Sequence, residues 1–423
     1  MSDALLSRVR DLLARGALDE ANVLASDALA AAPRDPVAWY MRGIVENRRG
    51  DYRAAVKALR MAIDLDPSAG LSWLSLGNAL ARLDDLPGAT RAYQAVVSRE
   101  PGWADARYNL GVVQRRQGDL DGAARAFHAA WSLDPMMFDA ARQCVSTIGE
   151  LARRPDGFVS SAFTRAAAAP DYSFTLGVCS IDEARLERTT ARYRRLFAGT
   201  RHEIVAVRNP ASLALAYNDI VQGSDADIVV VSHDDIDVLA DDFVARLSDA
   251  LDSFDGVGVV GTTKLAGPAI GWSGHPNLRG WIVHHVPGED EWSADALHPS
   301  AREGIIVALD GVFLAAHRKV FVDVPFEATT FDGFHLYDLD WSYRASDRGY
   351  RLGVAGDLLL VHASRGKYGS EWERYAERFW RKHGLTECAP KASSFFGARF
   401  GAAEQARQFF LLLAGLGREL ALS

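Results

Sequence analysis

The chain has 423 residues, of which 48% are hydrophobic and 24% are charged, and its formal net charge is −8. This length is sufficient for two or three domains, each with its own hydrophobic core, and the composition is ordinary for a globular protein. The negative charge, with a pI near 5.8, argues against a nucleic-acid binder that relies on neutralising phosphates. The three cysteines, Cys144, Cys179 and Cys388, lie far apart. Their spacing predicts neither a zinc site nor a disulfide framework and is typical of a reducing compartment.

The N-terminal stretch, MSDALLSRVRDLLARGALDEA, is charged throughout, so we do not expect a signal peptide. No apolar run approaches the roughly 20 residues that a membrane-spanning helix needs, and a cytoplasmic protein is therefore predicted. The longest apolar stretch is FFLLLAGLG at residues 409–417. It favours a terminal helix docked on the protein's own core; contact with a membrane surface or a second copy is the alternative.

The first third of the chain repeats with a period of 34 residues. Small residues, prolines and bulky residues all recur at this spacing: Gly43, Gly77 and Gly111; Ala55, Ala89 and Ala123; Pro33, Pro67, Pro101 and Pro135; Leu59, Tyr93 and Phe127. The small residues allow paired helices to approach closely, and the bulky ones fill the space between repeats. Proline ends each second helix because it lacks an N–H donor. Such a period is typical of helix–turn–helix solenoids.

Over residues 2–135 this pattern resembles the tetratricopeptide repeat family. We therefore expect an all-α solenoid with a capping helix over residues 1–150. Solenoids of this kind present a groove that binds peptides or proteins, so a protein partner is predicted for this part of the chain. Stacking on the neighbouring domain, or dimerisation, is the alternative role.

The pattern of residue types in the sequence changes after the repeats. Residues 151–171 lose the periodicity and are predicted to form a linker. From Tyr172 onward, helical patterns alternate with the β-rich runs YSFTLGVCSI, HEIVAVRN, ADIVVVSH and GVGVVGTT. This alternation predicts an α/β domain with a mostly parallel sheet covered on both faces. In such sheets ligands bind beyond the carboxyl ends of the strands.

An acidic cluster, HDDID at residues 233–237, directly follows the strand-like run IVVVS. Crowded carboxylates repel one another and resist leaving water, and a divalent cation relieves both effects. The cluster therefore predicts a metal site at the edge of the sheet. The alternative is a solvated acidic turn that caps the following helix.

The second part of the chain resembles a family 2-type glycosyltransferase of the GT-A fold, especially a bacterial subgroup whose metal motif is His-X-Asp. Here the motif is His233-Asp234-Asp235. The resemblance implies a nucleotide-sugar donor, with Asp234 among the residues that bind it, and Mn²⁺ or Mg²⁺ held by Asp235 and His233. A histidine ligand favours Mn²⁺. We place this domain at residues 172–390, followed by a C-terminal helical extension at 391–423.

A second acidic group lies in FDGFHLYDLDWSYRASDRGYRLGV. In the family that this chain resembles, Asp338 matches the catalytic carboxylate, while Tyr337 stands where glutamate is common. Asp338 is accordingly predicted to be the base that deprotonates the acceptor. Asp340 is predicted to support the site or to contact the acceptor. Because Asp is also a preferred N-cap, capping of the helix is the alternative role for Asp338, and the missing glutamate leaves the choice between the two aspartates open.

The segment LLLVHASRGKYG supplies a third group. The resemblance implies that His362, at the end of a strand, is a further metal ligand, and that Arg365 and Lys367 neutralise the diphosphate. A lone histidine after a strand is otherwise a structural residue. If the resemblance holds, His362 therefore meets the acidic cluster from a distant part of the sequence.

Four further residues are assigned to the predicted site because of the sequence segments in which they lie. Ser180 and Asn209 lie at the ends of the first two strand-like runs and are predicted to contact the nucleotide. Asp310, in the pair Asp310-Gly311, is expected among the donor-binding residues. Trp272 lies in the glycine-rich stretch KLAGPAIGWSGHPNLRGW, which is predicted to form an acceptor loop or lid.

Together these patterns predict a metal-dependent glycosyltransferase, related to hexosyltransferases and inverting by resemblance. The repeats favour a protein acceptor, although a glycan or lipid-linked acceptor remains open. An interaction scaffold with an inactive transferase-like domain is the main alternative, and a nucleotidyltransferase on a similar sheet is a third. Neither nucleic acid nor a transmembrane segment is expected, and membrane contact would be peripheral.

Overall fold

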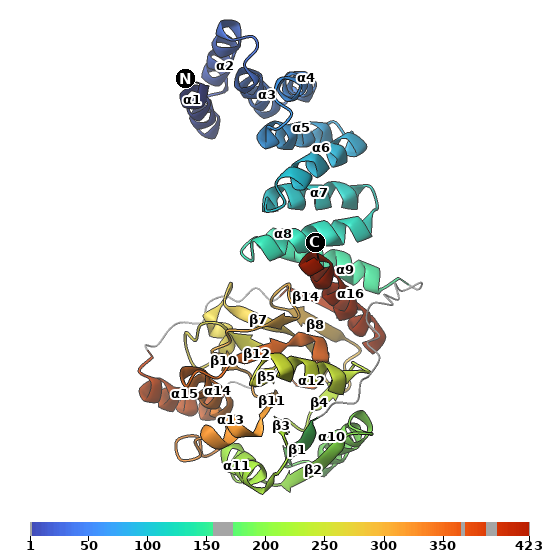
Figure 1. The fold of residues 1–423 in the computed structure, drawn as a ribbon, viewed down its shortest axis with the longest axis vertical. Coiled ribbons are helices and arrows are strands. Elements are labelled where there is room, and N and C mark those ends of the chain that lie inside the picture. The colour runs from blue at the N-terminus through green and yellow to red at the C-terminus, as the bar shows by residue number, and fades with distance from the viewer. Residues whose placement is uncertain (1, 155–171, 365–368, 386–395, 423) are drawn as a thin grey trace. The chain divides into compact units, whose positions relative to one another are not determined.

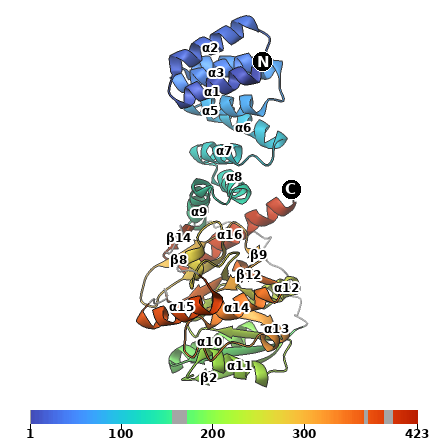
Figure 2. The ribbon, with the colours of Figure 1, turned by 90° about the vertical axis from the view of Figure 1, so that its left-hand side faces the viewer.

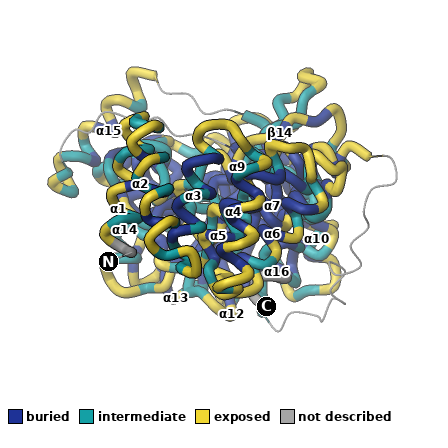
Figure 3. The backbone as a smooth tube through the Cα atoms, turned by 90° about the horizontal axis from the view of Figure 1, so that it is seen from above, coloured by how far each residue is buried: buried dark blue, intermediate teal, exposed yellow. Residues whose placement is uncertain are grey.

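The computed structural model describes residues 2–154, 172–364, 369–385 and 396–422 (Figure 1). The predicted linker at 151–171 therefore falls almost entirely outside the described residues. The chain divides into two compact units, Met1–Thr147 and Ile148–Ser423. Each unit has its own buried residues, coloured dark blue in Figure 3.

The first unit is a solenoid of paired helices, as the 34-residue period predicts. Each pair joins a first helix to a second one through a short turn. The second helices α4, α6 and α8 begin at the aspartate N-caps Asp51, Asp85 and Asp119, whose side chains accept hydrogen bonds from backbone N–H groups. The helices are α1 (Ser2–Ala14), α2 (Leu18–Ala31), α3 (Pro36–Arg49), α4 (Tyr52–Leu65), α5 (Gly70–Arg82), α6 (Leu86–Arg99), α7 (Ala104–Arg116) and α8 (Leu120–Leu133), and α9 (Phe138–Ala152) begins in the first unit and ends in the second.

The repeated glycines lie where the two helices of a pair touch. A Cβ atom added to Gly43 would lie 2.5 Å from Leu59, and one added to Gly77 would lie 2.5 Å from Tyr93. The repeated small and bulky positions are therefore partners across one interface. This contact explains why both classes of residue keep the same spacing.

The second unit is built on a mixed sheet. Its strands β1, β2 and β3 are parallel neighbours, whereas β11 runs antiparallel between β3 and β5, so the sheet is less parallel than the sequence predicted. The strand order is β2 (Arg201–Arg208), β1 (Ser173–Ser180), β3 (Ile228–Ser232), β11 (Phe313–His317), β5 (Gly256–Gly258), β12 (Leu352–Ala355) and β9 (Arg302–Glu303).

A second sheet lies beside the first. Its first strand in chain order, β4, directly follows the predicted metal-site residues His233 and Asp235. The predicted strand GVGVVGTT is split between the two sheets, because β5 joins the first and β6 the second. The second sheet contains β10 (Ala308–Leu309), β6 (Val260–Thr262), β7 (Leu278–His284), β13 (Leu360–His362) and β4 (Ile236–Val238), with β8 (Trp292–Ala296) paired to β7 and β14 (Phe396–Phe400) paired to β8.

Successive side chains along the strands of the first sheet point to opposite faces, so both faces carry apolar residues. Helices cover both of these faces. On one face Cys179 belongs to a core shared with Tyr217, Phe321 and Trp341, whereas on the other Phe174 packs against Phe197. The core helices are α11 (Leu213–Gly223), α13 (Arg318–Asp323), α14 (Tyr337–Asp347) and α15 (Ser370–His383), and the opposite face carries α10 (Glu183–Leu196) and α12 (Phe243–Ser253). In Figure 2, α14 and α15 lie side by side.

The C-terminal extension contains a strand as well as the predicted helix. Residues 396–400 alternate buried and exposed side chains and pair with β8, which explains why they form β14. The apolar stretch at 409–417 lies in α16 (Ala403–Leu422), where Phe410 stacks on Trp281 with ring centroids 5.3 Å apart. None of the helices within the described residues is long and apolar enough to cross a membrane.

Candidate functional site

Three residues from two separated segments meet at the edge of the sheets. His233 directly follows β3, Asp235 precedes β4, and His362 ends β13. Their side-chain ligand atoms all lie within 4.8 Å of one another. The antiparallel pairing of β4 with β13 produces this meeting, since it places His362 opposite Ile236 and lets the Ala363 N–H donate to the Asp235 carbonyl over 2.8 Å.

The charges of this group suit metal binding. The His362 Nε2 and His233 Nδ1 atoms lie 3.4 and 3.9 Å from Asp235 Oδ1. Burial alone would raise the pKa of Asp235, but its hydrogen bond with His362 and the two imidazoles hold that pKa well below its usual range. Burial and the neighbouring His362 lower the pKa of His233. An ionised carboxylate and a neutral imidazole are the forms that ligate metals, so the donor set fits a divalent ion, and two nitrogens favour Mn²⁺ over Mg²⁺.

The other acidic residues of the cluster are engaged in different contacts. Asp234 accepts a short hydrogen bond from the Ser180 hydroxyl, and its carbonyl accepts one from Thr189 over 2.7 Å. Asp237 pairs with Arg192. Among these residues, Ser180 and Asp234 are the ones that the sequence assigned to the donor, and the structure brings them together.

Arg185 is a site residue that the sequence analysis missed. Its guanidinium lies 3.9 Å from Asp234 Oδ1 and 4.0 Å from Asp235 Oδ2, and its side chain is 46% exposed. It belongs to the first turn of α10, which Asp182 caps. The helix α10 is rich in arginine, and no sequence pattern distinguishes Arg185 from its other arginines. Only the fold shows that Arg185 lies beside Asp234 and Asp235.

Two cavities flank the acidic cluster. One, of about 410 Å³, opens beside His233 and is lined in part by Ser180, Pro210, Tyr217 and Phe334. The other, of about 440 Å³, lies along α10 and β4. Both are lined by Arg185, Asp234 and Asp235, so the cluster forms the wall between them.

Asn209, which the sequence assigned to the nucleotide, contacts Ser180 through its backbone. Its φ angle is +49°, and its backbone N–H donates to the Ser180 carbonyl over 2.8 Å. In the part of the chain that the structure describes, Asn209 lines neither of the two cavities, whereas the next residue, Pro210, lines one. The structure therefore places the backbone of this turn, more than the Asn209 amide, beside the site.

Asp338 is held at the start of α14. The N-cap residue of the helix is Leu336, which has a φ of +63°, and the helix begins at the next residue. Asp338 therefore lies within the first turn and does not cap the helix. Its Oδ2 accepts a hydrogen bond from the Gly311 N–H over 2.7 Å. Burial and the neighbouring carboxylate of Asp310 raise the pKa of Asp338 to about 7. A carboxylate with this pKa can accept a proton near neutral pH.

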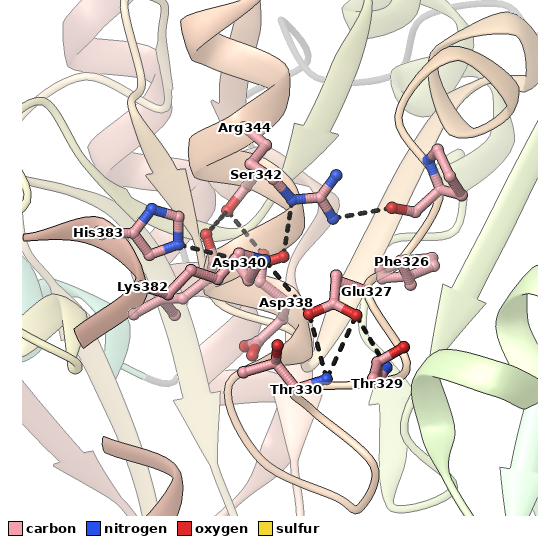
Figure 4. A network of polar contacts seen from close by, with 12 residues as sticks. Phe326, Glu327, Thr329, Thr330, Asp338, Asp340, Ser342, Arg344, Lys382 and His383 are labelled. Atoms are coloured by element: carbon pink, nitrogen blue, oxygen red, sulfur yellow. Dashed lines mark hydrogen bonds and ion pairs between the residues drawn. The ribbon is translucent and has the colours of Figure 1, made fainter. Parts of the chain in front are cut away.

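Asp340 faces a different environment (Figure 4). It is fully buried, and its carboxylate lies 2.6 Å from Lys382 Nζ, 2.8 Å from His383 Nε2 and 2.7 Å from Arg344 Nε. Burial raises the pKa of Asp340, but the hydrogen bonds from His383 and Lys382 lower it further than burial raises it. Because these three nitrogen donors surround the carboxylate, Asp340 joins α14 to the end of α15, whereas Asp338 contacts the Gly311 N–H.

The remaining predicted residues are placed as follows. Ser364 hydrogen-bonds to His362 Nε2 over 3.0 Å, whereas Arg365 and Lys367 lie outside the described residues. Trp272 packs against Trp372 and Trp380 of α15, with ring centroids 5.9 and 6.0 Å apart. It lines neither of the two cavities, and its ring contacts tie this loop to α15.

Comparisons with known proteins agree with this architecture. A model of the glycosyltransferase-like family matches residues 176–383, and a tetratricopeptide repeat model matches residues 6–70 and 74–135. No curated protein matches the chain.

Several solved structures are similar to about a third of the chain. MamA 41-end from Desulfovibrio magneticus RS-1 is 24% identical, over 34% of this chain and 82% of that one, with a TM-score of 0.32. YrrB, described as a TPR protein with an unusual peptide-binding site, is 23% identical, over 36% and 79% of the two chains, with a TM-score of 0.32. PilF of Pseudomonas aeruginosa is 18% identical, over 35% and 68%, with a TM-score of 0.34. The family matches, together with the fold, show that this chain carries tetratricopeptide repeats followed by a domain of the glycosyltransferase-like family.

Proposed function

We propose that the protein is a divalent-metal-dependent glycosyltransferase that moves a sugar from a nucleotide-sugar donor to an acceptor. The observation that carries this proposal is the meeting of His233, Asp235 and His362 within 4.8 Å, inside a glycosyltransferase-like domain. A scaffold with a disabled site would have no need to keep these three side chains together.

His233, Asp235 and His362 would hold the metal, which when bound supplies positive charge for the diphosphate and for its departure. The cavity beside His233 would take the nucleotide, with Ser180 and Asp234 as its polar wall. Arg185 lies between the two cavities, where its guanidinium would neutralise phosphate charge.

Asp338 would act as the base. As the acceptor oxygen attacks the anomeric carbon, its proton passes to the Asp338 carboxylate, and the bond between that carbon and the diphosphate breaks. Attack opposite the leaving diphosphate in a single displacement inverts the anomeric configuration. The Gly311 N–H, which donates to Asp338 Oδ2, would fix the orientation of the carboxylate through these changes.

The repeats would recruit a protein or peptide acceptor. This part of the proposal rests on the presence of a tetratricopeptide solenoid in the same chain as the transferase domain. A transferase coupled to such a groove can select its substrate at a distance from the reacting hydroxyl.

Thermal denaturation with UDP, GDP, CMP and dTDP, each with and without Mn²⁺, tests the function. A ligand at about 100 times its Kd stabilises a protein by roughly 2.7 kcal/mol, which gives a readily measured rise in Tm. We expect a Mn²⁺-dependent rise for one nucleotide, and we expect Asp235→Asn to remove it. If none of the four nucleotides shifts the Tm with Mn²⁺, the scaffold function is favoured over the transferase.

A further inference from the structure

The cavity along α10 is lined by a row of arginines, of which the proposed function uses only Arg185. The row consists of Arg185, Arg188, Arg192 and Arg195. These residues follow one another at steps of three, four and three, so they share one face of the helix. The cavity beside His233 is lined by Arg185 alone of these four. With a volume of about 440 Å³, the cavity along α10 is large enough for a small organic ligand.

Two of the four guanidinium groups have no partner in the protein. Arg192 pairs with Asp237, and Arg185 faces the acidic cluster. Within the residues that the structure describes, the side chains of Arg188 and Arg195 make no hydrogen bond or ion pair, although both line the cavity. Like charges three or four residues apart on a helix repel one another. A bound anion would relieve this repulsion, and guanidinium groups match the geometry of phosphate oxygens.

Another part of the lining is aromatic. His285 and Trp292 both line the cavity and stack on each other, with ring centroids 3.9 Å apart and ring planes 5° apart. The stack is held in place, because His285 Nδ1 donates to the Glu291 carbonyl over 3.1 Å and Trp292 begins β8, which pairs with both β7 and β14. A fixed aromatic surface beside charged donors suits a ligand that has both a carbon ring and an anionic group.

We propose that the cavity along α10 is a second ligand site, which binds a sugar phosphate, with the phosphate on the arginine row and the ring against Trp292. The ligand is either a free ester or the head group of a lipid, since both present the same chemistry. The inference goes beyond the proposed function and does not depend on it, because Arg188, Arg195 and Trp292 do not line the cavity beside His233. The acidic cluster separates the two cavities, so both ligands can be bound at once.

Calorimetric titration of the full-length, metal-free protein with glucose 6-phosphate tests the site, with glucose and inorganic phosphate as comparison ligands. We expect saturable binding of the sugar phosphate that is tighter than the binding of either part. Arg188→Gln and Arg195→Gln should each raise its Kd about 10-fold, because each removes a charge-assisted hydrogen bond. Arg194→Gln is the matched control: Arg194 is exposed on the same helix, carries the same charge and lines neither cavity, so its variant should keep the wild-type Kd.

Vesicle flotation distinguishes the two sources of the ligand. The vesicles are phosphatidylcholine with or without phosphatidylinositol, whose head group is a polyol ring joined to phosphate. Binding that requires phosphatidylinositol and is weakened by Arg188→Gln, without binding of free sugar phosphate, would identify a lipid head group. Binding of the free ester would identify a soluble ligand. Binding of neither, or binding that Arg188→Gln and Arg195→Gln leave unchanged, would overturn the inference.

The proposed function is tested separately by the Mn²⁺-dependent rise in Tm with a nucleotide. Arg188→Gln and Arg195→Gln should both keep this rise, since neither residue lines the cavity beside His233. If the wild type shows no such rise but binds the sugar phosphate, the proposed function fails and the second site stands.

Discussion

Gly311 and Asp338 are in direct contact: the Gly311 N–H donates to Asp338 Oδ2 over 2.7 Å. A Cβ atom added to residue 311 would lie 2.6 Å from the Cβ atom of Asp338, so only glycine leaves room for this contact. The pair Asp310-Gly311 therefore acts on Asp338 in two ways. The Asp310 carboxylate raises its pKa, and Gly311 holds its position.

The first prediction concerns this contact. Gly311→Ala should push Asp338 out of place and lower the turnover by about 10²-fold, because displacements near 1 Å cost about that much. The Mn²⁺-dependent nucleotide shift should persist, since the three atoms nearest the added Cβ all belong to Asp338. Gly223→Ala, at a glycine with nothing within 4 Å of the added Cβ, serves as the control and should leave turnover unchanged. Equal turnover in both variants would show that the position of Asp338 is not limiting.

The second prediction addresses the base directly. Asp338→Asn preserves the shape of the side chain but cannot accept the acceptor's proton, so turnover should fall by about 10²–10⁴-fold. The variant should still bind the nucleotide with Mn²⁺. Single-turnover sugar transfer, measured beside the Tm shift, separates these effects, and wild-type turnover in the variant would remove Asp338 from the mechanism.

The third prediction is a pH profile. Asp338 must be ionised to act as a base, and its pKa is raised to about 7 by burial and by Asp310. Turnover at saturating substrate should therefore rise with pH through about 7 and level off above it. A profile that is flat from pH 6 to 8 would be inconsistent with this carboxylate as the base.

The same pKa predicts a dependence of stability on pH. The folded protein keeps the Asp338 proton up to about pH 7, whereas the unfolded chain loses it near the usual value of 3.8. The folded state thus binds more protons in this window, so the contribution of Asp338 to the free energy of unfolding falls as pH rises through it. The Tm of Asp338→Asn relative to wild type should accordingly be higher at pH 8 than at pH 4. Differential scanning calorimetry at both values measures this.

The fifth prediction concerns the ion pairs by which Asp340 joins α14 to the end of α15. Asp340→Asn would leave Lys382, His383 and Arg344 without their buried anion, and breaking such a group costs about 3–5 kcal/mol. The folded-state pKa of Asp340 is lowered, so its stabilisation is present near neutral pH and is lost as the pH falls through the acid range. At neutral pH we expect a clear fall in Tm, with Mn²⁺ binding retained. A Tm equal to that of the wild type would mean that the cations find other partners.

The sequence by itself determined the repeats, because their contacts are local. Gly77 meets Tyr93 only 16 residues away, and the same contact recurs between Gly43 and Leu59 and between Gly111 and Phe127, so the pattern is visible as a period. It also located strands β1 and β3, since buried strands require continuous apolar runs, and the edge strand β2, whose segment is rich in β-branched residues. The acidic cluster follows β3 directly, which predicts a metal site at the edge of the sheet, and the resemblance to glycosyltransferases with a His-X-Asp motif selects His233 and Asp235 within it.

The tertiary structure decided which distant groups meet. The pairing of β4 with β13 places His362 beside Asp235, although more than a hundred residues separate them in the chain. The side chains of Asp338 and Asp340 are two residues apart in sequence, yet one faces Gly311 and the other the end of α15. Such choices depend on the register between strands and on the rotation of a helix, which are set by packing across the whole domain. A local pattern of residue types carries no record of either, and the position of Arg185 beside Asp234 and Asp235 is visible only in the assembled fold.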